Sequence, residues 1–407
     1  MPGNSLLTID MVSVETVRIF KNSNLFIQNV DTQYDNAFAI NGAKIGDSLR
    51  IRLPNDYVVH DGPAMQLQDT SEQYTTLTID SYKSVAIAFT SKERTLDIDE
   101  YSERYIAPAV NNIAGKCAQT VMTKMSLAAC NLVANFNAGA IITPTMDTFL
   151  LANANLDDNS ADQMTRYMVN DPTTDARTSA GLAGLLNPTP DVSQQFRSGM
   201  MKSGLGYNKW FRDQTVVKFT AGTFSAGGTV AGGGQSGTSI TVNAITGTLK
   251  KGDIITFEGV NAVNRVTKQS LETLRQFVVT ADVATTGTVI PIYPALTPAV
   301  GGSDVQYQTV DASPINGAAM DLVTAAGAVY RRSLAYVYKA ITMATADLII
   351  PPAGMGVVAS RSVYDGISMR IMSGFLMQTD QIATRMDLLF GSLAVRPEWM
   401  AVVADKI

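Results

Sequence analysis

The stretch that decides the fold class is FTAGTFSAGGTVAGGGQSGTSITVNAITGTL, residues 219–249, which contains no ionisable side chain. It continues into a turn and a short apolar run, Lys250, Lys251, Gly252 and Asp253 followed by Ile254 to Phe257. Glycine, threonine, serine and valine with apolar residues at alternate positions are typical of strands and turns. We therefore predict an all-β domain around this stretch.

The segments on either side of this region have helical patterns. Apolar residues recur at three- and four-residue spacing in 99–135, and 315–330 is rich in alanine. From Asn316 onward we expect a helix capped by that residue. The chain is therefore predicted to be α+β, with the all-β domain inserted into a mixed core that resumes after it.

The first thirty residues predict an amphipathic helical arm. Its apolar stripe is Leu7, Met11, Val14, Val17 and Phe20, and the charged residues between them are Asp10, Glu15, Arg18 and Lys21. Two interpretations stay open. The helix either docks on its own domain or reaches out to bind a partner, because chain termini are usually loose unless something holds them.

Two long elements follow the arm. Alternating residues from Ile45 to Leu53, and again from Leu77 to Phe89, predict a hairpin too long to bury one face on its own domain. Its tip is expected to lie on a neighbour. An apolar stripe over Ala109–Ala134 predicts a spine helix, and about twenty-six residues would span ~40 Å.

Composition narrows the classes of function. The chain has 407 residues, of which 46% are hydrophobic and only 16% charged. This charged fraction is lower than in typical free monomers, which favours a protein whose surface is covered in an assembly. The net charge of −5 argues against high-affinity nucleic-acid binding as the main task, although a surface lying beside DNA stays compatible with it.

The same sequence contains no pattern for membrane insertion or secretion. No uncharged apolar run reaches the ~18 residues that a membrane span needs, and the beginning lacks a basic segment followed by an apolar one. Cys117 and Cys130 are predicted to lie far apart on the spine helix. We expect both to be free thiols in a reducing compartment.

Catalytic chemistry has weak candidates. The single histidine, His60, has only Asp61 as a sequence neighbour and is predicted to be a surface-loop residue. Gly232 to Gly237 matches G-x-G-x-x-G, but a strand pattern follows where phosphate binding needs a helix. The carboxylates of Asp97, Asp99, Glu100 and Glu103 fit a helix start better than a cation site. We predict no enzyme activity, cofactor or metal.

Short motifs spread over the chain resemble the coat proteins of Salmonella-type short-tailed phages. Lys251-Gly252-Asp253 with Phe257-Glu258-Gly259-Val260 is similar to a turn that opens a strand pair in that family's insertion domain. Near the C-terminus, residues 385–391 (RMDLLFG) and 395–398 (VRPE) are similar to the family's closing strands.

The resemblance implies the fold of tailed-phage major capsid proteins, with peripheral and axial domains. The predicted organisation is an arm at 1–35, an extended hairpin loop at 36–95, a core with the spine helix at 96–212, the β-rich insertion at 213–311, and the second part of the core at 312–407. The insertion is expected to stabilise the subunit and to fold alone. Its turn, Lys250, Lys251, Gly252 and Asp253, is the insertion's candidate site.

The implied function is that of a building block of an icosahedral head. Implied partners are copies of itself in pentamers and hexamers, a scaffolding protein, a portal protein and double-stranded DNA packaged without sequence specificity, with no membrane. Assembly would take place in the host cytoplasm, and the precursor shell would expand as DNA enters. Scaffolding proteins of the family tend to present basic surfaces, so Asp10 and Glu15 are candidate scaffold contacts.

Two alternatives from other classes remain at this point. A β-rich binding or decoration protein of a virion surface would use the insertion as its recognition domain, and it would stay small in solution. A hydrolase built on the carboxylates near Asp97 would need a tuned acid and base pair, which nothing nearby resembles.

Overall fold

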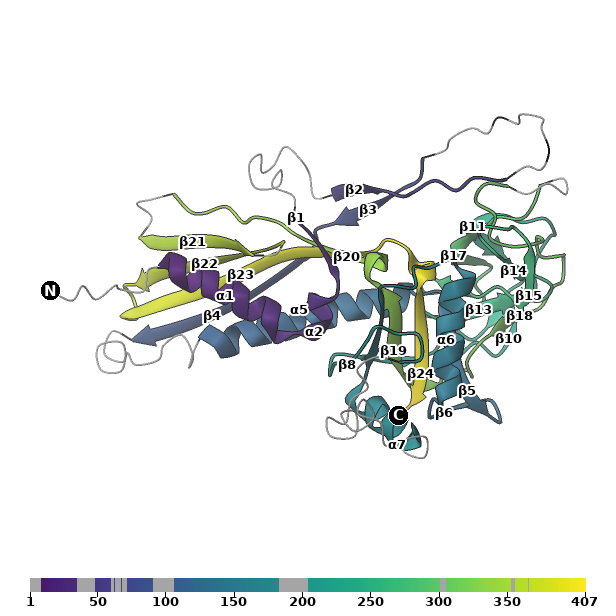
Figure 1. Cartoon of the computed structure of the whole chain (residues 1–407), viewed down its shortest axis with the longest axis horizontal. Helices are drawn as coiled ribbons and strands as arrows, with labels where there is room; N and C mark the ends of the chain where they lie inside the picture. The colour runs from purple at the N-terminus through teal and green to yellow at the C-terminus, as the bar shows by residue number, and fades with distance from the viewer. Residues whose placement is uncertain are drawn as a thin grey trace. The chain divides into compact units, whose positions relative to one another are not determined.

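The computed structural model describes residues 9–34, 48–59, 62, 67, 72–90, 106–182, 204–300, 305–352, 356–364 and 366–407. Figure 1 shows the helices and strands of these residues in chain order. They divide into two compact units. The first unit is drawn from residues 1–51, 74–121 and 341–393, and the second from residues 52–73, 122–340 and 394–407.

The first unit is built on a six-stranded sheet. Its path runs β1 (Asp31–Tyr34), β20 (Ile341–Thr345), β23 (Gln381–Ala394), β22 (Ile367–Leu376) and β21 (Val357–Tyr364), and β4 (Ser81–Thr90) also pairs with β23. On β23, Met386, Leu388 and Phe390 are fully buried at alternate positions. One face of this strand therefore contributes to the core.

Helix α1 (Ile9–Ser23) confirms the predicted helical arm and packs against β21 and β22 of its own unit. Its buried side chains include Ser13, Thr16, Val17 and Phe20, whereas Val14 is 56% exposed. The predicted apolar stripe was therefore wrong at Val14. The buried side of the helix instead includes the small hydroxyl side chains of Ser13 and Thr16. Ser13 Oγ lies 3.1 Å from Ser360 Oγ of β21. The docked interpretation of the arm gains support.

A second short helix, α2 (Leu25–Gln28), follows directly. The Asn24 side chain accepts hydrogen bonds from the backbone N–H groups of Phe26 at 2.8 Å and Ile27 at 3.1 Å. Asparagine is a favoured N-cap because its side-chain oxygen satisfies such orphan donors. The cap starts the turn that buries both apolar residues.

Helix α5 (Ala107–Ala128) is the predicted spine helix, and its buried stripe includes Val110, Ile113 and Val121. It ends at Ala128 rather than Ala134, because the next residues form β5 (Asn131–Asn137) and pair in parallel with β24 (Met400–Lys406). Cys130 therefore lies beyond the helix. Cys117 and Cys130 are buried free thiols, as predicted, and burial raises the pKa of Cys130 to about 12.

The second unit has a seven-stranded core sheet. Its path is β6 (Ala140–Ile142), β5, β24, β19 (Val329–Val337), β7 (Arg166–Asn170) and β8 (Lys209–Arg212), and β9 (Val217–Thr220) pairs with β19. The two longer helices of this unit are α6 (Met146–Asp158) and α7 (Pro172–Leu182), and the short 3-10 helices are η4 (Tyr338–Ala340) and η5 (Pro397–Trp399). Central β24 and β19 are buried along most of their length.

The predicted all-β insertion forms a five-stranded sheet of the second unit. The order is β11 (Gly237–Thr241), β17 (Val289–Leu296), β16 (Phe277–Val279), β13 (Ile254–Phe257) and β18 (Met320–Leu322). Two small pairs accompany it, β10 (Ala226–Gly227) with β12 (Ile245–Thr246), and β14 (Asn261–Val263) with β15 (Ser270–Leu274). One hydrophobic cluster, with Phe224, Phe257 and Phe277 among its members, fills the interior.

The alanine-rich segment after the insertion corrects the sequence prediction. Residues 315–330 form no helix, so the expected cap at Asn316 was wrong. Met320 is buried in the insertion's cluster and pairs with Phe257 of β13. Long-range pairing thus overrides helix propensity. The sheet consequently extends past residue 311 to Leu322, and we propose a later boundary for the insertion.

The extended hairpin region also differs from the prediction. The expected single return strand over Leu77–Phe89 is two strands, β3 (Tyr74–Thr78), which pairs with β2 (Ser48–Arg52), and β4. Because β4 pairs with β23 over ten residue pairs, that half of the segment is held by its own sheet. Most of the hairpin tip lies outside the described residues. A contact between the tip and a neighbour stays a prediction.

The weak chemical candidates have different outcomes. Gly232 to Gly237 leads into β11, which confirms the predicted turn before a strand. His60 and the carboxylates of Asp97, Asp99, Glu100 and Glu103 lie outside the described residues. Of the helices that the structure describes, none combines the length and apolar character needed to cross a membrane.

Candidate functional site

The insertion turn at residues 250–253 is closed by its own aspartate. The Asp253 carboxylate accepts hydrogen bonds from the backbone N–H of Lys250 at 2.7 Å and from that of Gly222 at 3.0 Å. The Asp253 N–H in turn donates to the Lys250 carbonyl at 2.9 Å. The side chain thus accepts hydrogen bonds from two chain segments, one after β9 and one before β13, and it holds the start of β13 in place.

Gly252 brings this turn against the core of the same unit. Its φ of +97° is a conformation that favours glycine, and its N–H donates to the Val279 carbonyl at 2.8 Å. A Cβ at this position would lie 2.6 Å from Leu127 Cδ2 and 3.1 Å from Arg332 Nη1. The backbone conformation therefore favours glycine, and an added Cβ would also have to displace the ends of the Leu127 and Arg332 side chains.

Arg332 on β19 is the core residue that receives the turn. It is fully buried, and its Nη1 donates to the Gly252 carbonyl at 2.8 Å. Its guanidinium carbon lies 4.6 Å from the centre of the Phe219 ring and 5.8 Å from that of Tyr330, which are cation–π distances. The arginine therefore connects the turn to strands β9 and β19, which carry Phe219 and Tyr330.

Burial sets the electrostatics of this joint. It lowers the pKa of Arg332, and Tyr330 and Asp253 oppose that effect. Burial also raises the pKa of Asp253, against the hydrogen bonds from Lys250 and Gly222 and the positive charge of Arg332. Arg332 Nε and Nη2 have no hydrogen-bond partner among the described residues. Arg332 and Asp253 are thus two buried ionisable groups whose desolvation is costly, and the charge of each favours the charged form of the other.

The two lysines of the predicted turn play a different part from Gly252 and Asp253. Lys250 and Lys251 are both exposed. The Lys251 N–H donates to the side chain of Asp282 at 2.7 Å, which holds the outer edge of the turn. The structure therefore separates the four predicted residues into a buried pair facing the core and an exposed pair.

A second attachment lies at Gln276. Its side-chain oxygen accepts from the Leu132 N–H at 2.6 Å, and its side-chain nitrogen donates to the Leu132 carbonyl at 3.1 Å. The amide thus pairs with β5 as a neighbouring backbone would. Arg332 and Gln276 were both missed from the sequence, where each resembles an ordinary surface residue. The only signal was Gln276's place beside the apolar run Phe277 to Val279.

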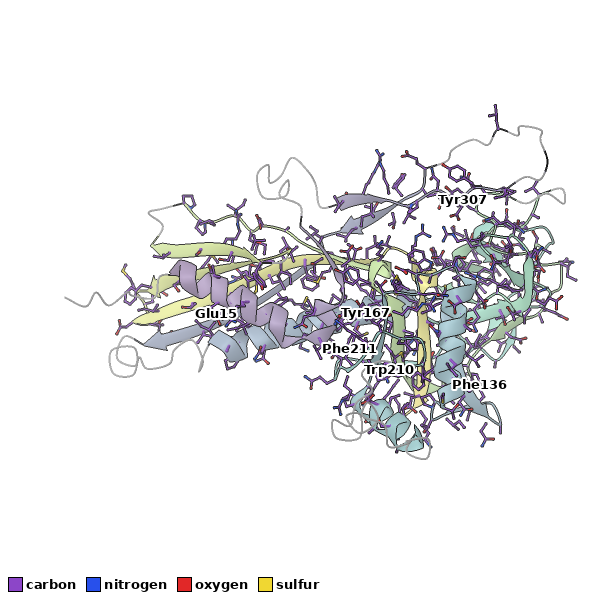
Figure 2. All side chains as sticks on the ribbon, viewed as in Figure 1. Glu15, Phe136, Tyr167, Trp210, Phe211 and Tyr307 are labelled. Atoms are coloured by element: carbon purple, nitrogen blue, oxygen red, sulfur yellow. The ribbon has the colours of Figure 1, made fainter. Side chains whose placement is uncertain are left out.

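The candidate scaffold contacts lie on α1. Glu15 projects from the helix (Figure 2), and its carboxylate forms an ion pair with Arg18 at 2.6 Å. The hydrogen bond from Arg18 lowers the pKa of Glu15. Asp10 lies in the first turn of the helix, five residues before Glu15, and its side chain is outside the described residues.

Comparisons with known proteins bear on this arrangement. Residues 235–403 match a family model described as "P22 coat protein - gene protein 5". This segment is therefore similar in sequence to a phage coat protein. The match includes the turn at residues 250–253 and Arg332, and it supports a tailed-phage major capsid protein. The resemblance read from the sequence motifs is thereby confirmed.

Solved structures give weaker likenesses. The chain is similar to the capsid of the cyanophage P-SCSP1u at 10% identity and a TM-score of 0.48, covering 94% of this chain and 88% of that one. The capsid of Ralstonia phage GP4 is similar at 8% identity and a TM-score of 0.42, covering 93% of this chain and 86% of that one. The CUS-3 coat protein I-domain is similar at 28% identity and a TM-score of 0.19, covering 24% of this chain and 96% of that one. A comparison with curated proteins found no match.

Metal chemistry has no candidate in the part of the chain that the structure describes. No group of three or more histidine, cysteine, aspartate or glutamate side chains is placed there to hold an ion. The predicted absence of catalysis stays a prediction.

Proposed function

We propose that this chain is the major shell subunit of an icosahedral phage head that encloses double-stranded DNA. The observation that carries the proposal is the coat-protein match over residues 235–403, which runs from the insertion through β19 and β23 into β24. A decoration protein would need only the insertion. The match instead continues past the insertion and includes strands of both compact units.

The proposed mechanism is geometric rather than chemical. Copies of the subunit would form pentamers and hexamers, and many weak contacts would sum to a stable closed shell. The exposed apolar side chains of Val358, Val363, Tyr364 and Phe375 on β21 and β22 support this mechanism. Exposed apolar surface of this kind often marks a protein interface.

The insertion's proposed part is to stabilise the subunit. Gly252 and Arg332 hold one side of the insertion against the core, and Gln276 holds another through Leu132. Contacts that link distant segments of the chain restrain the unit as a whole. These contacts would therefore hold the insertion in place when neighbouring subunits exert force on it.

The finer steps belong to the same proposal. A scaffolding protein would guide a precursor shell in the host cytoplasm, with Asp10 and Glu15 among its contacts, and a portal protein would occupy one vertex. The shell would then expand as DNA enters. The net charge of −5 is consistent with DNA packed without sequence-specific binding.

Electron microscopy of the purified protein tests the proposal. The chain is expressed alone and together with the scaffolding protein of its source phage, and particles are examined by negative stain after gel filtration. We expect closed or aberrant shells in both cases, with more regular ones when scaffold is present. A monodisperse monomer or dimer at high concentration, in several salt conditions, contradicts the proposal and favours a binding or decoration protein.

A further inference from the structure

A cavity of about 170 Å³ lies within the second unit. Segments far apart in the sequence line it: the chain after β2, the insertion and the residues just before β24. The side chains that matter here are Asp56, Arg265, Arg275, Tyr293, Arg396 and Glu398. Tyr307, which is labelled in Figure 2, also lines the cavity. Its hydroxyl donates to the Asn55 side-chain oxygen at 3.2 Å. The volume exceeds the ~30 Å³ share of one water molecule.

The charges around this cavity do not balance. Three arginines, Arg265, Arg275 and Arg396, line it together with two carboxylates. Asp56 is engaged by Arg265 Nε at 2.7 Å, and Glu398 accepts a hydrogen bond from the Tyr293 hydroxyl at 2.8 Å. With both carboxylates already engaged, Arg275 and Arg396 retain donors for another acceptor.

Arg275 is only 7% exposed and is incompletely satisfied. Its Nη1 donates to the Asn159 side-chain oxygen at 3.0 Å. Its Nε is buried and has no hydrogen-bond partner among the described residues. An unpaired buried donor on a charged group is costly, so the site favours a ligand that supplies an acceptor.

Arg396 is 8% exposed, and its guanidinium carbon lies 4.5 Å from the centre of the Trp399 ring. The Trp399 indole N–H donates to the Asn159 carbonyl at 3.1 Å, which holds the ring in place. The Arg396 guanidinium makes no hydrogen bond to any residue that the structure describes. Burial and the nearby positive charge of Arg265 lower the pKa of Arg396.

We propose that this cavity binds a small oxyanion, a phosphate or a carboxylate group, through Arg275 and Arg396. Planar guanidinium groups match the spacing of two oxygens on such ligands and bind them through paired, charge-assisted hydrogen bonds. Trp399 would orient Arg396, and Asn159 would orient both Trp399 and Arg275. The bound anion would offset the excess positive charge and join the hairpin, insertion and C-terminal segment of the unit.

Thermal unfolding of the full chain, kept as unassembled subunits, tests this inference independently of shell formation. Sodium phosphate, sodium acetate and sodium chloride are titrated at equal ionic strength, and binding of the first two is also measured by calorimetry. We expect the melting temperature to rise saturably with at least one oxyanion beyond the chloride series. A larger rise with phosphate identifies a phosphate ligand, and a larger rise with acetate identifies a carboxylate from another molecule. Equal curves for all three salts overturn the proposal.

Variants connect the effect to the cavity. Arg396→Gln should weaken oxyanion binding at least tenfold, whereas Arg52→Gln removes a positive charge at an arginine whose side chain is 81% exposed and should leave binding unchanged. If Arg396→Gln does not fold, Arg396→Lys decides, because lysine keeps the charge but lacks the planar pair of donors. Wild-type affinity in the folded Arg396 variant overturns the assignment, as does an equal loss in Arg52→Gln.

Discussion

The insertion and the N-terminal arm are attached to their units in opposite ways. The insertion closes its own hydrophobic cluster and adds polar contacts to the core, a buried one at Gly252 and a part-buried one at Gln276. The arm helix α1 contributes one buried side to a core that β21 and β22 complete. We therefore predict that the insertion keeps its fold without its neighbours, whereas the arm depends on the surface beneath it.

The same contrast separates their acidic residues. Asp253 is 1% exposed and accepts hydrogen bonds from backbone donors in two chain segments, whereas the Glu15 side chain is 40% exposed and pairs with Arg18. Burial amplifies electrostatic and hydrogen-bond effects, and solvent screens them at the surface. Asp253 should therefore govern stability, and Glu15 should govern encounters with partners.

The largest expected effect concerns autonomous folding of the insertion. A fragment of residues 221–328 retains β18, whose Met320 is buried in the cluster, and the backbone bonds that join Ala221 to Ala328 at its ends. It should melt cooperatively with dispersed amide resonances. A fragment of residues 213–311 lacks β18 and should be largely unfolded, because losing a buried methionine costs about 1.5–3 kcal/mol before the lost pairing with β13 is counted.

Two outcomes contradict that prediction in different ways. If both fragments are unfolded while the full chain is folded, the insertion depends on the core and the contrast with the arm fails. If the two fragments melt alike, β18 is not part of the autonomous fold and the earlier boundary at residue 311 is correct.

Within the turn at residues 250–253, Gly252 should give the largest effect of a point substitution. Gly252→Ala introduces both a strained positive φ, worth about 1–2 kcal/mol, and a clash with Leu127 and Arg332, worth about 1–3 kcal/mol. Gly259→Ala is the matched control, because its φ is +73° and no atom lies within 4 Å of the added Cβ. Calorimetry of the full chain should show a clearly larger loss at Gly252. Equal losses would mean that the close approach to the core has no energetic consequence.

Asp253 should follow. Asp253→Ala leaves the buried N–H of Gly222 and the part-buried N–H of Lys250 without their acceptor, at about 1–3 kcal/mol for the buried donor. Asp282→Ala also removes a carboxylate that accepts one N–H, from Lys251, but at an exposed position, and should cost less. Urea unfolding of the two variants against the wild-type chain measures the difference. A loss at Asp282 as large as at Asp253 refutes the role given to burial.

The pH dependence sharpens the Asp253 prediction. Burial raises the folded-state pKa of this carboxyl above its ordinary value of 3.8, so the folded chain holds the proton more tightly than the unfolded chain. Its contribution to stability is then fully present below the unfolded-state pKa and decreases as pH rises through the folded-state pKa. The stability lost in Asp253→Ala should therefore be greater in acid than at neutral pH. A loss that grows as pH rises would have the wrong sign.

Local patterns in the sequence predicted much of the fold. Three- and four-residue spacing indicated α1 and most of α5, and alternation indicated the strands of the insertion. These elements are determined largely by residues next to each other. The turn at Gly252 and Asp253 was likewise visible, because glycine and aspartate suit tight turns.

Residues paired over long distances were the ones that sequence reasoning missed. Met320 lies in an alanine-rich segment that favours a helix, but pairing with Phe257 of β13 makes it a strand residue. The joint at Gly252 depends on Leu127 and Arg332, which lie on elements far along the chain in either direction. A fully buried arginine has no local signature, since its burial is created by the rings of Phe219 and Tyr330.

The smallest effect on stability, and the sharpest contrast with the insertion, is expected at the arm. Reversing the charge of Asp10 and Glu15 together, with Asp10→Lys and Glu15→Lys, should leave the thermal unfolding of the subunit nearly unchanged, because Glu15 and Arg18 form a solvent-screened surface pair. Scaffold content per particle, measured by gel densitometry, should fall several-fold, since many copies act together on one shell. Asp321→Lys changes an exposed carboxylate on the insertion and is the control.

The ion pair with Arg18 suggests a second variant that should change scaffold content in the opposite direction. Glu15 must exchange Arg18 for a basic group of the scaffold, and the hydrogen bond from Arg18, which lowers the pKa of Glu15, competes with that exchange. Arg18→Gln should therefore increase scaffold content while the double reversal decreases it. Unchanged content in the Asp10 and Glu15 variant would rule out the arm carboxylates as scaffold contacts. A decrease in Arg18→Gln would mean that the scaffold binds the arm through Arg18 rather than through Glu15.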